Sequence, residues 1–144
     1  MELIYLPYYF FDVELTSDAG TRQVGIAVDA VLAATVFFTS DALQREGGAE
    51  GAVCDFVQSP EAARRTALEE YRGFLLEHGL RSKRAMSVQG ISEPERVHYP
   101  FWVAYVKRRG SYDVKALDAV SGEGQGVKAR KVLLAALRRM AAPS

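Results

Sequence analysis

The sequence predicts an α+β fold, in which two duplicated hairpin–helix (ββα) units form one antiparallel sheet of four to six strands and two helices pack on one face of it. The first observation is a proline-led aromatic strand, followed by a return strand ending in Asp-Ala-Val, at residues 6–31 and again at 99–120. The second is a stretch with helical periodicity after each copy. Because consecutive strands lie a short turn apart, the pattern favours antiparallel hairpins over parallel crossover units.

The position of each turn tests the repeat. Turns centred on residues 18–19 and 109–110 put the matched residues of the two copies opposite each other, Tyr8 with Asp29 and Phe101 with Asp118. A three-residue loop ending at Gly20 would instead shift the first register by one residue and require a bulge. The agreement between the copies favours the first register and a duplicated unit.

Alternation along the strands separates their faces. In the first copy one face is apolar, whereas the other carries Asp12, Glu14 and Gln23 after the aromatic residues Tyr8 and Phe10. The second copy is apolar on both faces, so its strands are either covered twice or meet a partner chain. We therefore expect a homodimer whose interface draws on Phe101, Trp102, Val103 and Tyr105.

The remaining elements follow from local signals. Ser59-Pro60-Glu61 is a helix start with a capping hydroxyl, a proline and an acid, and Gly79 predicts the stop. The polar residues 81–96 predict a connection between the copies. The other predicted elements are strands at Thr35–Phe38 and Val53–Val57, a helical turn near Asp41–Arg45, and a last helix over Val127–Ala141. We expect a single domain over 1–144, with the repeats spanning 3–80 and 97–142.

Composition and charge narrow the class of protein. No apolar run approaches the about 20 residues that span a bilayer, and the start is acidic rather than basic, which predicts a cytoplasmic protein. The zero net charge hides a contrast, since residues 1–58 carry 2 − 9 = −7 and residues 59–144 carry 16 − 9 = +7. The halves either attract each other within the fold or expose a basic surface to an anionic partner.

Two basic segments are candidate sites for an anion, a phosphate ligand or a nucleic acid. A glycine-rich turn runs directly into the last helix, whose first turn is basic although the helix dipole disfavours cations there. The second segment is a basic hairpin tip with tyrosines beside it, a composition that suits single-stranded nucleic acid. Flexible turns with solvated basic side chains are the commoner explanation of both segments. The candidate residues are Gly124, Gly126, Lys128, Arg130, Lys131, Lys107, Arg108 and Arg109.

Catalytic candidates are few. Asp29 and Asp118 are repeat mates that could share a proton, or each could accept a backbone hydrogen bond from two residues further on. Cys54, His78 and His98 are too scattered to predict a metal site, and Cys54 fits a small core residue. We therefore expect no metal and no cofactor, and an enzyme is the least supported class.

The run Asp118-Ala119-Val120-Ser121-Gly122-Glu123, after the strand with Pro100-Phe101-Trp102, resembles the D-A-x-S/T-G-E turn of PepSY-type domains and similar uncharacterised bacterial domains. The resemblance covers about twenty-five residues of the second copy. It implies an inhibitory or interaction module and transfers no catalytic residue. The sequence thus predicts a non-enzymatic, self-associating protein-interaction module. The alternatives are a binder of anionic ligands or nucleic acid and, with least support, a hydrolase.

Overall fold

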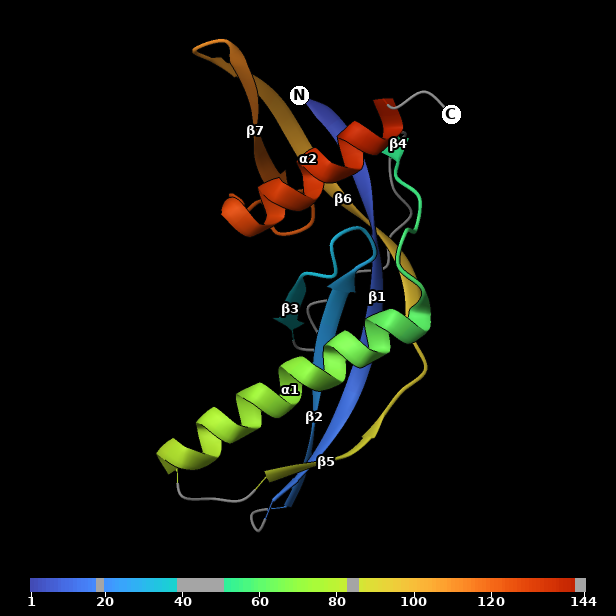
Figure 1. Ribbon diagram of the computed structural model, residues 1–144, viewed down its shortest axis with the longest axis vertical. Helices are drawn as coiled ribbons and strands as arrows, with labels where there is room; N and C mark the ends of the chain where they lie inside the picture. The colour runs from blue at the N-terminus through green and yellow to red at the C-terminus, as the bar shows by residue number, and fades with distance from the viewer. Residues whose placement is uncertain (18–19, 39–50, 83–85, 142–144) are drawn as a thin grey trace.

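The computed structural model describes residues 1–17, 20–38, 51–82 and 86–141. The chain forms one sheet with two helices, and the main strand order is β3-β2-β1-β6-β7, with β4 and β5 added at the two ends of β1 (Figure 1). All strand pairs among the described residues are antiparallel except β1 with β4, so the predicted α+β class with an antiparallel sheet is confirmed. The sheet has seven strands where four to six were predicted, because the short strands β4 and β5 also pair with β1. The elements are β1 (Glu2–Ser17), β2 (Gly20–Asp29), β3 (Thr35–Phe38), β4 (Ala52–Val53), α1 (Pro60–Ser82), β5 (Met86–Ile91), β6 (Glu95–Arg108), β7 (Ser111–Asp118) and α2 (Val127–Ala141).

The two hairpins have the predicted registers. Tyr8 pairs with Asp29 in the β1–β2 hairpin, and Phe101 pairs with Asp118 in the β6–β7 hairpin. The second turn is tight because Arg109 and Gly110 both have positive φ, 41° and 84°, as a two-residue turn between twisted strands requires. Turn position therefore fixed the register correctly in both hairpins.

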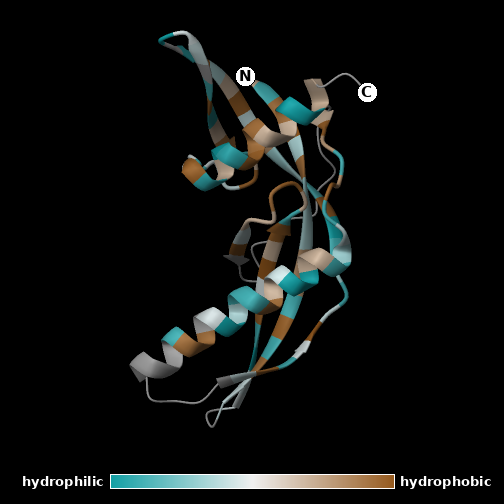
Figure 2. Ribbon diagram, in the orientation of Figure 1, coloured by the Kyte–Doolittle hydropathy of each residue, from teal (hydrophilic) through white to brown (hydrophobic). Residues whose placement is uncertain are grey.

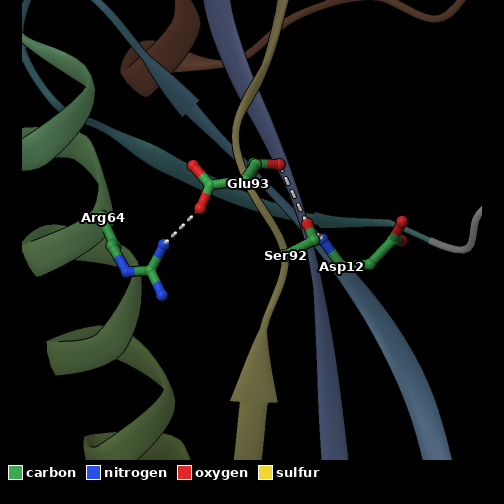
Figure 3. A network of polar contacts seen from close by, with 4 residues as sticks. All are labelled: Asp12, Arg64, Ser92 and Glu93. Atoms are coloured by element: carbon green, nitrogen blue, oxygen red, sulfur yellow. Dashed lines mark hydrogen bonds and ion pairs between the residues drawn. The ribbon is translucent and has the colours of Figure 1, made fainter.

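β1 is the central strand along its whole length. One of its edges pairs first with β4 and then with β2, whereas the other pairs first with β6 and then with β5. Ser92 lies in the short segment between β5 and β6 and links that segment to β1 by two hydrogen bonds. Its backbone N–H donates to the carbonyl of Asp12, and its hydroxyl oxygen accepts from the N–H of Asp12 at 2.8 Å (Figure 3). The carboxylate of Glu93, the next residue, lies 4.0 Å from the guanidinium of Arg64, and this ion pair links the same segment to α1.

The apolar core is divided between the two faces of β1. Ile4, Leu6, Tyr8 and Phe10 pack with Val132, Leu133 and Ala136 of α2, whereas Tyr9, Phe11, Val13 and Leu15 pack with Ala63, Ala67 and Tyr71 of α1. Because neighbouring side chains on a strand point to opposite faces, the helices cover opposite faces. Figure 1 shows α2 at the end with β6 and β7, and α1 along β2 and β5. Apolar segments lie behind both helices (Figure 2).

The prediction that both helices pack on one face is therefore wrong. Sequence alternation identified the apolar face of the first hairpin, which α1 covers. The other face is exposed at Asp12, Glu14 and Gln23, as predicted, whereas its start at Tyr8 and Phe10 is buried because α2 from the second half of the chain packs there. The two ββα units consequently do not match as whole units, since α1 and α2 do not take equivalent places.

Several local predictions need correction. Residues 86–91, expected in a polar connection, form β5, because β1 supplies a free edge beyond the end of β6. α1 continues through Gly79 to Ser82, since an interior glycine costs a helix only about 1 kcal/mol. The strand expected over 53–57 is only Ala52–Val53. The strand at Thr35–Phe38 and the helix at Val127–Ala141 are confirmed, and the turn expected near residues 41–45 lies outside the described residues.

Within the described ranges, neither helix combines the length and the apolar character required to cross a bilayer.

Candidate functional site

The turn after β2 is built on Asp29, a carboxylate with no exposed surface. Its Oδ1 accepts hydrogen bonds from the N–H groups of Val31 at 3.0 Å and Leu32 at 2.6 Å, and its Oδ2 accepts one from Ala34. Burial raises the pKa of Asp29 above its ordinary value, and these backbone N–H bonds oppose the rise. The buried carboxylate thus supplies acceptors to the N–H groups of a turn that is itself only partly buried.

The turn after β7 repeats this pattern on Asp118. Its Oδ1 accepts from the N–H groups of Val120 at 2.8 Å and Ser121 at 3.0 Å, at the same spacing in sequence as in the first turn. The N–H of Asp118 donates to the carbonyl of Glu123, as the N–H of Asp29 does to the residue five positions on. The predicted bond to the N–H two residues on is therefore confirmed at both aspartates. Asp118 also accepts from the Tyr99 hydroxyl, at 2.8 and 2.7 Å.

A cavity of about 490 Å³ lies where the two turns, the sheet and the start of α2 meet. Tyr8, Phe10, Tyr99 and Phe101 supply aromatic walls from the face of β1 and β6 that α2 covers. The two aspartates both line it, one from each hairpin. A cavity of this size that is mostly apolar, with a few convergent polar groups, is typical of a small-molecule site. Its other lining residues are Ala27, Ala34, Val36, Val120, Ser121, Glu123, Gln125, Gly126, Lys128, Ala129 and Val132.

The basic residues at the start of α2 are largely engaged within the protein. The Lys128 ammonium donates to the carbonyl of Thr35, and the Arg130 guanidinium lies 3.5 Å from the Asp113 carboxylate. Lys131 is exposed. Lys128 and Arg130 thus have partners within the chain, which offset part of the unfavourable position of cations at a helix N-terminus.

The glycine-rich segment also has a structural role. Gly124 pairs with Leu117 in an isolated bridge, which extends the edge of β7. Gly122 has φ of 78°, a conformation that suits glycine, and the carbonyl of Gly126 accepts the first hydrogen bond of α2 from Arg130. The segment therefore closes a turn and begins a helix.

The basic hairpin tip does not join the α2 segment. Lys107 and Arg109 are exposed, and the β6–β7 hairpin extends past α2 (Figure 1). The side chain of Arg108 lies outside the described residues. The eight candidate anion-binding residues are thus divided between two separate surfaces.

The predicted interface residues are divided between core and surface. Phe101 and Val103 are buried beneath α2, so they cannot serve an interface with another chain. Trp102 points to the opposite face of β6 and is 39% exposed. Tyr105 is 54% exposed, and its hydroxyl donates to Glu2 at 3.0 Å.

Cys54 belongs to the core around α2, as the sequence predicts. Its thiol lies 3.2 Å from the Sδ of Met140, and burial, followed by the nearby Asp55 charge, raises its pKa to about 11. The thiol is therefore protonated at neutral pH, which is the opposite of what a nucleophile requires. His98 packs edge-on against Phe56, and in the described part of the chain no three His, Cys, Asp or Glu side chains gather as metal ligands.

Sequence reasoning missed the cavity. The feature that could have indicated it is the pair Tyr8 and Phe10 on an otherwise polar face of the strand. Large aromatic side chains are usually at least partly buried. What buries that face is α2, more than a hundred residues further along the chain.

Comparisons of the chain with protein-family models, with curated proteins and with solved structures give no match. The resemblance of residues 118–123 to PepSY-type domains stays a prediction. The geometry of the chain itself therefore carries the functional argument.

Proposed function

We propose that the chain is a non-enzymatic interaction module that self-associates through an open apolar face at one end of the sheet. This open face consists of Tyr5, Val53, Trp102 and Leu117, which the strand registers bring to one side of β4, β1, β6 and β7. The observation that carries the proposal is Trp102, which is 39% exposed in the middle of a strand. Leu117, opposite Trp102 on β7, is also exposed, and so is Val53 of β4 on the far side of β1.

Among the described residues, no helix packs on the open face. α2 packs on the opposite face, and α1 covers the same side of β1 only from Tyr9 onward. Tryptophan and tyrosine are enriched at the centres of interfaces, where burial gains the most free energy. A two-fold dimer would place this patch against its own copy and cover both tryptophans at once.

Sedimentation equilibrium across a wide range of protein concentration tests this proposal. We expect the wild-type chain to form a dimer and the Trp102→Glu variant to stay monomeric, since a charge at the centre of the patch opposes burial. Leu76→Glu is the matched control, because Leu76 is exposed on α1, away from the open face. A wild-type chain that is monomeric at every concentration would disprove self-association.

The second candidate function is the binding of single-stranded nucleic acid at the β6–β7 tip. An exposed aromatic ring, Tyr105, precedes the exposed cations Lys107 and Arg109, and stacking with phosphate pairing is how such sites bind. Affinity should fall steeply between about 50 and 200 mM salt and should be lost in Lys107→Ala/Arg109→Ala. An affinity that does not change with salt concentration would exclude this function.

A hydrolase remains the least supported alternative. The two aspartates line one cavity, yet their oxygens accept backbone N–H groups, and among the described residues no hydrogen bond joins one carboxylate to the other. Carboxylate oxygens that accept the backbone N–H groups of a turn are typical of structural aspartates.

The proposal includes a duplication, restricted to the hairpins and the turns that follow them. Matching Pro7 with Pro100 also matches Leu6 with Tyr99, and these two residues face each other across β1 and β6. Such a pairing is what a local two-fold axis through the sheet would produce. The shared aspartate turns, together with the carbonyls of Pro7 and Pro100 accepting from Ala30 and Ala119, support this reading.

A further inference from the structure

The cavity beside α2 is walled by aromatic rings. The Tyr8 ring centroid lies 6.2 Å from those of both Phe10 and Tyr99, and Tyr99 lies 5.4 Å from Phe101. These rings line the cavity from two different hairpins. A cation that lies over the face of an aromatic ring is attracted by the negative charge of that face, so an aromatic lining suits a cationic ligand.

The charged side chains around the cavity are mainly acidic. Among the described residues that line it, Asp29, Asp118 and Glu123 are acidic and Lys128 is basic. The Lys128 ammonium is already bonded to the carbonyl of Thr35. Because the lining is mostly apolar, these charges act on a bound molecule more strongly than they would on an open, polar surface.

Glu123 is the carboxylate best placed to meet a ligand. It is exposed at the cavity, and no described residue donates to its side chain. Asp118 also lines the cavity and is half-buried, and its carboxylate accepts a hydrogen bond from the Tyr99 hydroxyl. The pKa of the Tyr8 hydroxyl is raised first by burial and then by Asp29, Tyr99 and Asp118, which agrees with a negative potential inside the cavity.

We propose that this cavity binds an organic monocation, a primary or quaternary amine with an aromatic or aliphatic body. The apolar body packs against the aromatic walls, and the ammonium group faces Asp118 and Glu123. An anion of the same size would meet three carboxylates and a lysine that is already engaged. The charge of the site therefore selects the sign of the ligand. This inference does not depend on self-association, since the open face lies on the other side of the sheet.

Three probes of one skeleton test the charge preference. Phenethylamine is a cation, phenethyl alcohol is neutral and phenylacetate is an anion, and titration calorimetry on the full chain compares their affinities. We expect the amine to bind about tenfold more tightly than the alcohol, and the anion to bind most weakly. Amide chemical shifts should move in residues 118–129 and not in α1.

Glu123→Gln keeps the size and polarity of the side chain and removes its charge. It should weaken binding of phenethylamine about three- to fivefold and leave phenethyl alcohol unchanged. Glu69→Gln on the exposed face of α1 is the matched control and should change neither affinity.

Equal affinity for amine and alcohol, tighter binding of phenylacetate, shifts confined to α1, or no binding of any probe would each overturn the proposal. A monomeric protein that still prefers the amine would refute self-association and leave the monocation site standing.

Discussion

The turns after β2 and β7 have the same hydrogen bonds in different surroundings. In both, an aspartate Oδ1 accepts from the N–H groups two and three residues on. Asp29 is completely buried and its turn leads into β3, whereas Asp118 is half-buried and its turn leads through glycines into α2. The local geometry thus follows from aspartate at a strand end, and the burial of each turn decides how much that geometry contributes to stability.

The largest expected effect of this difference is in Asp29→Ala. The substitution leaves one buried and two partly buried N–H groups without their acceptor, and we expect the free energy of unfolding to fall by about 3–5 kcal/mol. Urea denaturation followed by circular dichroism measures it. Asp29→Asn should lose less, because an amide oxygen can still accept. A loss below about 1 kcal/mol would show that burial does not determine how much the turn contributes to the free energy of unfolding.

The same change in the other turn should cost less. Asp118→Ala removes the acceptor of two exposed N–H groups that water can reach, so we expect a loss of about 1–2 kcal/mol in the same urea experiment. Tyr99→Phe serves as a control for the hydroxyl bond to Asp118. Equal losses in the two alanine variants would remove the contrast between the turns.

The stability that Asp29 contributes should also depend on pH, by a smaller amount. Because burial raises the folded-state pKa of Asp29 above its ordinary 3.8, its contribution to stability is fully present below that pH and is lost as pH rises through the folded-state pKa. The stability of wild type relative to Asp29→Asn should therefore decrease from acid towards neutral pH. Paired urea titrations across this range measure the trend, and a relative stability that rises with pH would contradict it.

The smallest expected effect concerns the turn of the second hairpin. Arg109 has φ of 41°, a conformation that asparagine adopts more readily than arginine. Arg109→Asn should therefore raise the free energy of unfolding by about 0.5 kcal/mol. Thermal unfolding measures the gain, with Lys107→Asn as a control that removes a charge without relieving the turn. A lower melting temperature in Arg109→Asn would argue against strain there.

The sequence predicted what local chemistry decides. The paired positions Tyr8 with Asp29 and Phe101 with Asp118, the strand at 35–38 and the helix at 127–141 all follow from turn residues and periodicity. β5 was missed because its residues Ser87, Gln89 and Gly90 have weak strand preference, and the strand exists through its pairing with β1.

The face covered by each helix could not be predicted, nor could the cavity that results. Alternation in β1 shows that its two faces differ, and it contains no information on which helix covers which face. The bond from Lys128 to the carbonyl of Thr35 illustrates the same limit, since 93 positions separate the two residues. A helix-terminal lysine looks available to a ligand in the sequence and is engaged in the folded protein.

The position of β1 has a consequence for how the molecule opens. Tyr8, Tyr9 and Phe10 pair with β2 on one side and β6 on the other, and their side chains reach both halves of the core. If either helix leaves the sheet, the face of β1 that it covers becomes exposed. Unfolding of one half of the core therefore destabilises the other half. Amide hydrogens here should exchange with deuterium only when the entire chain unfolds.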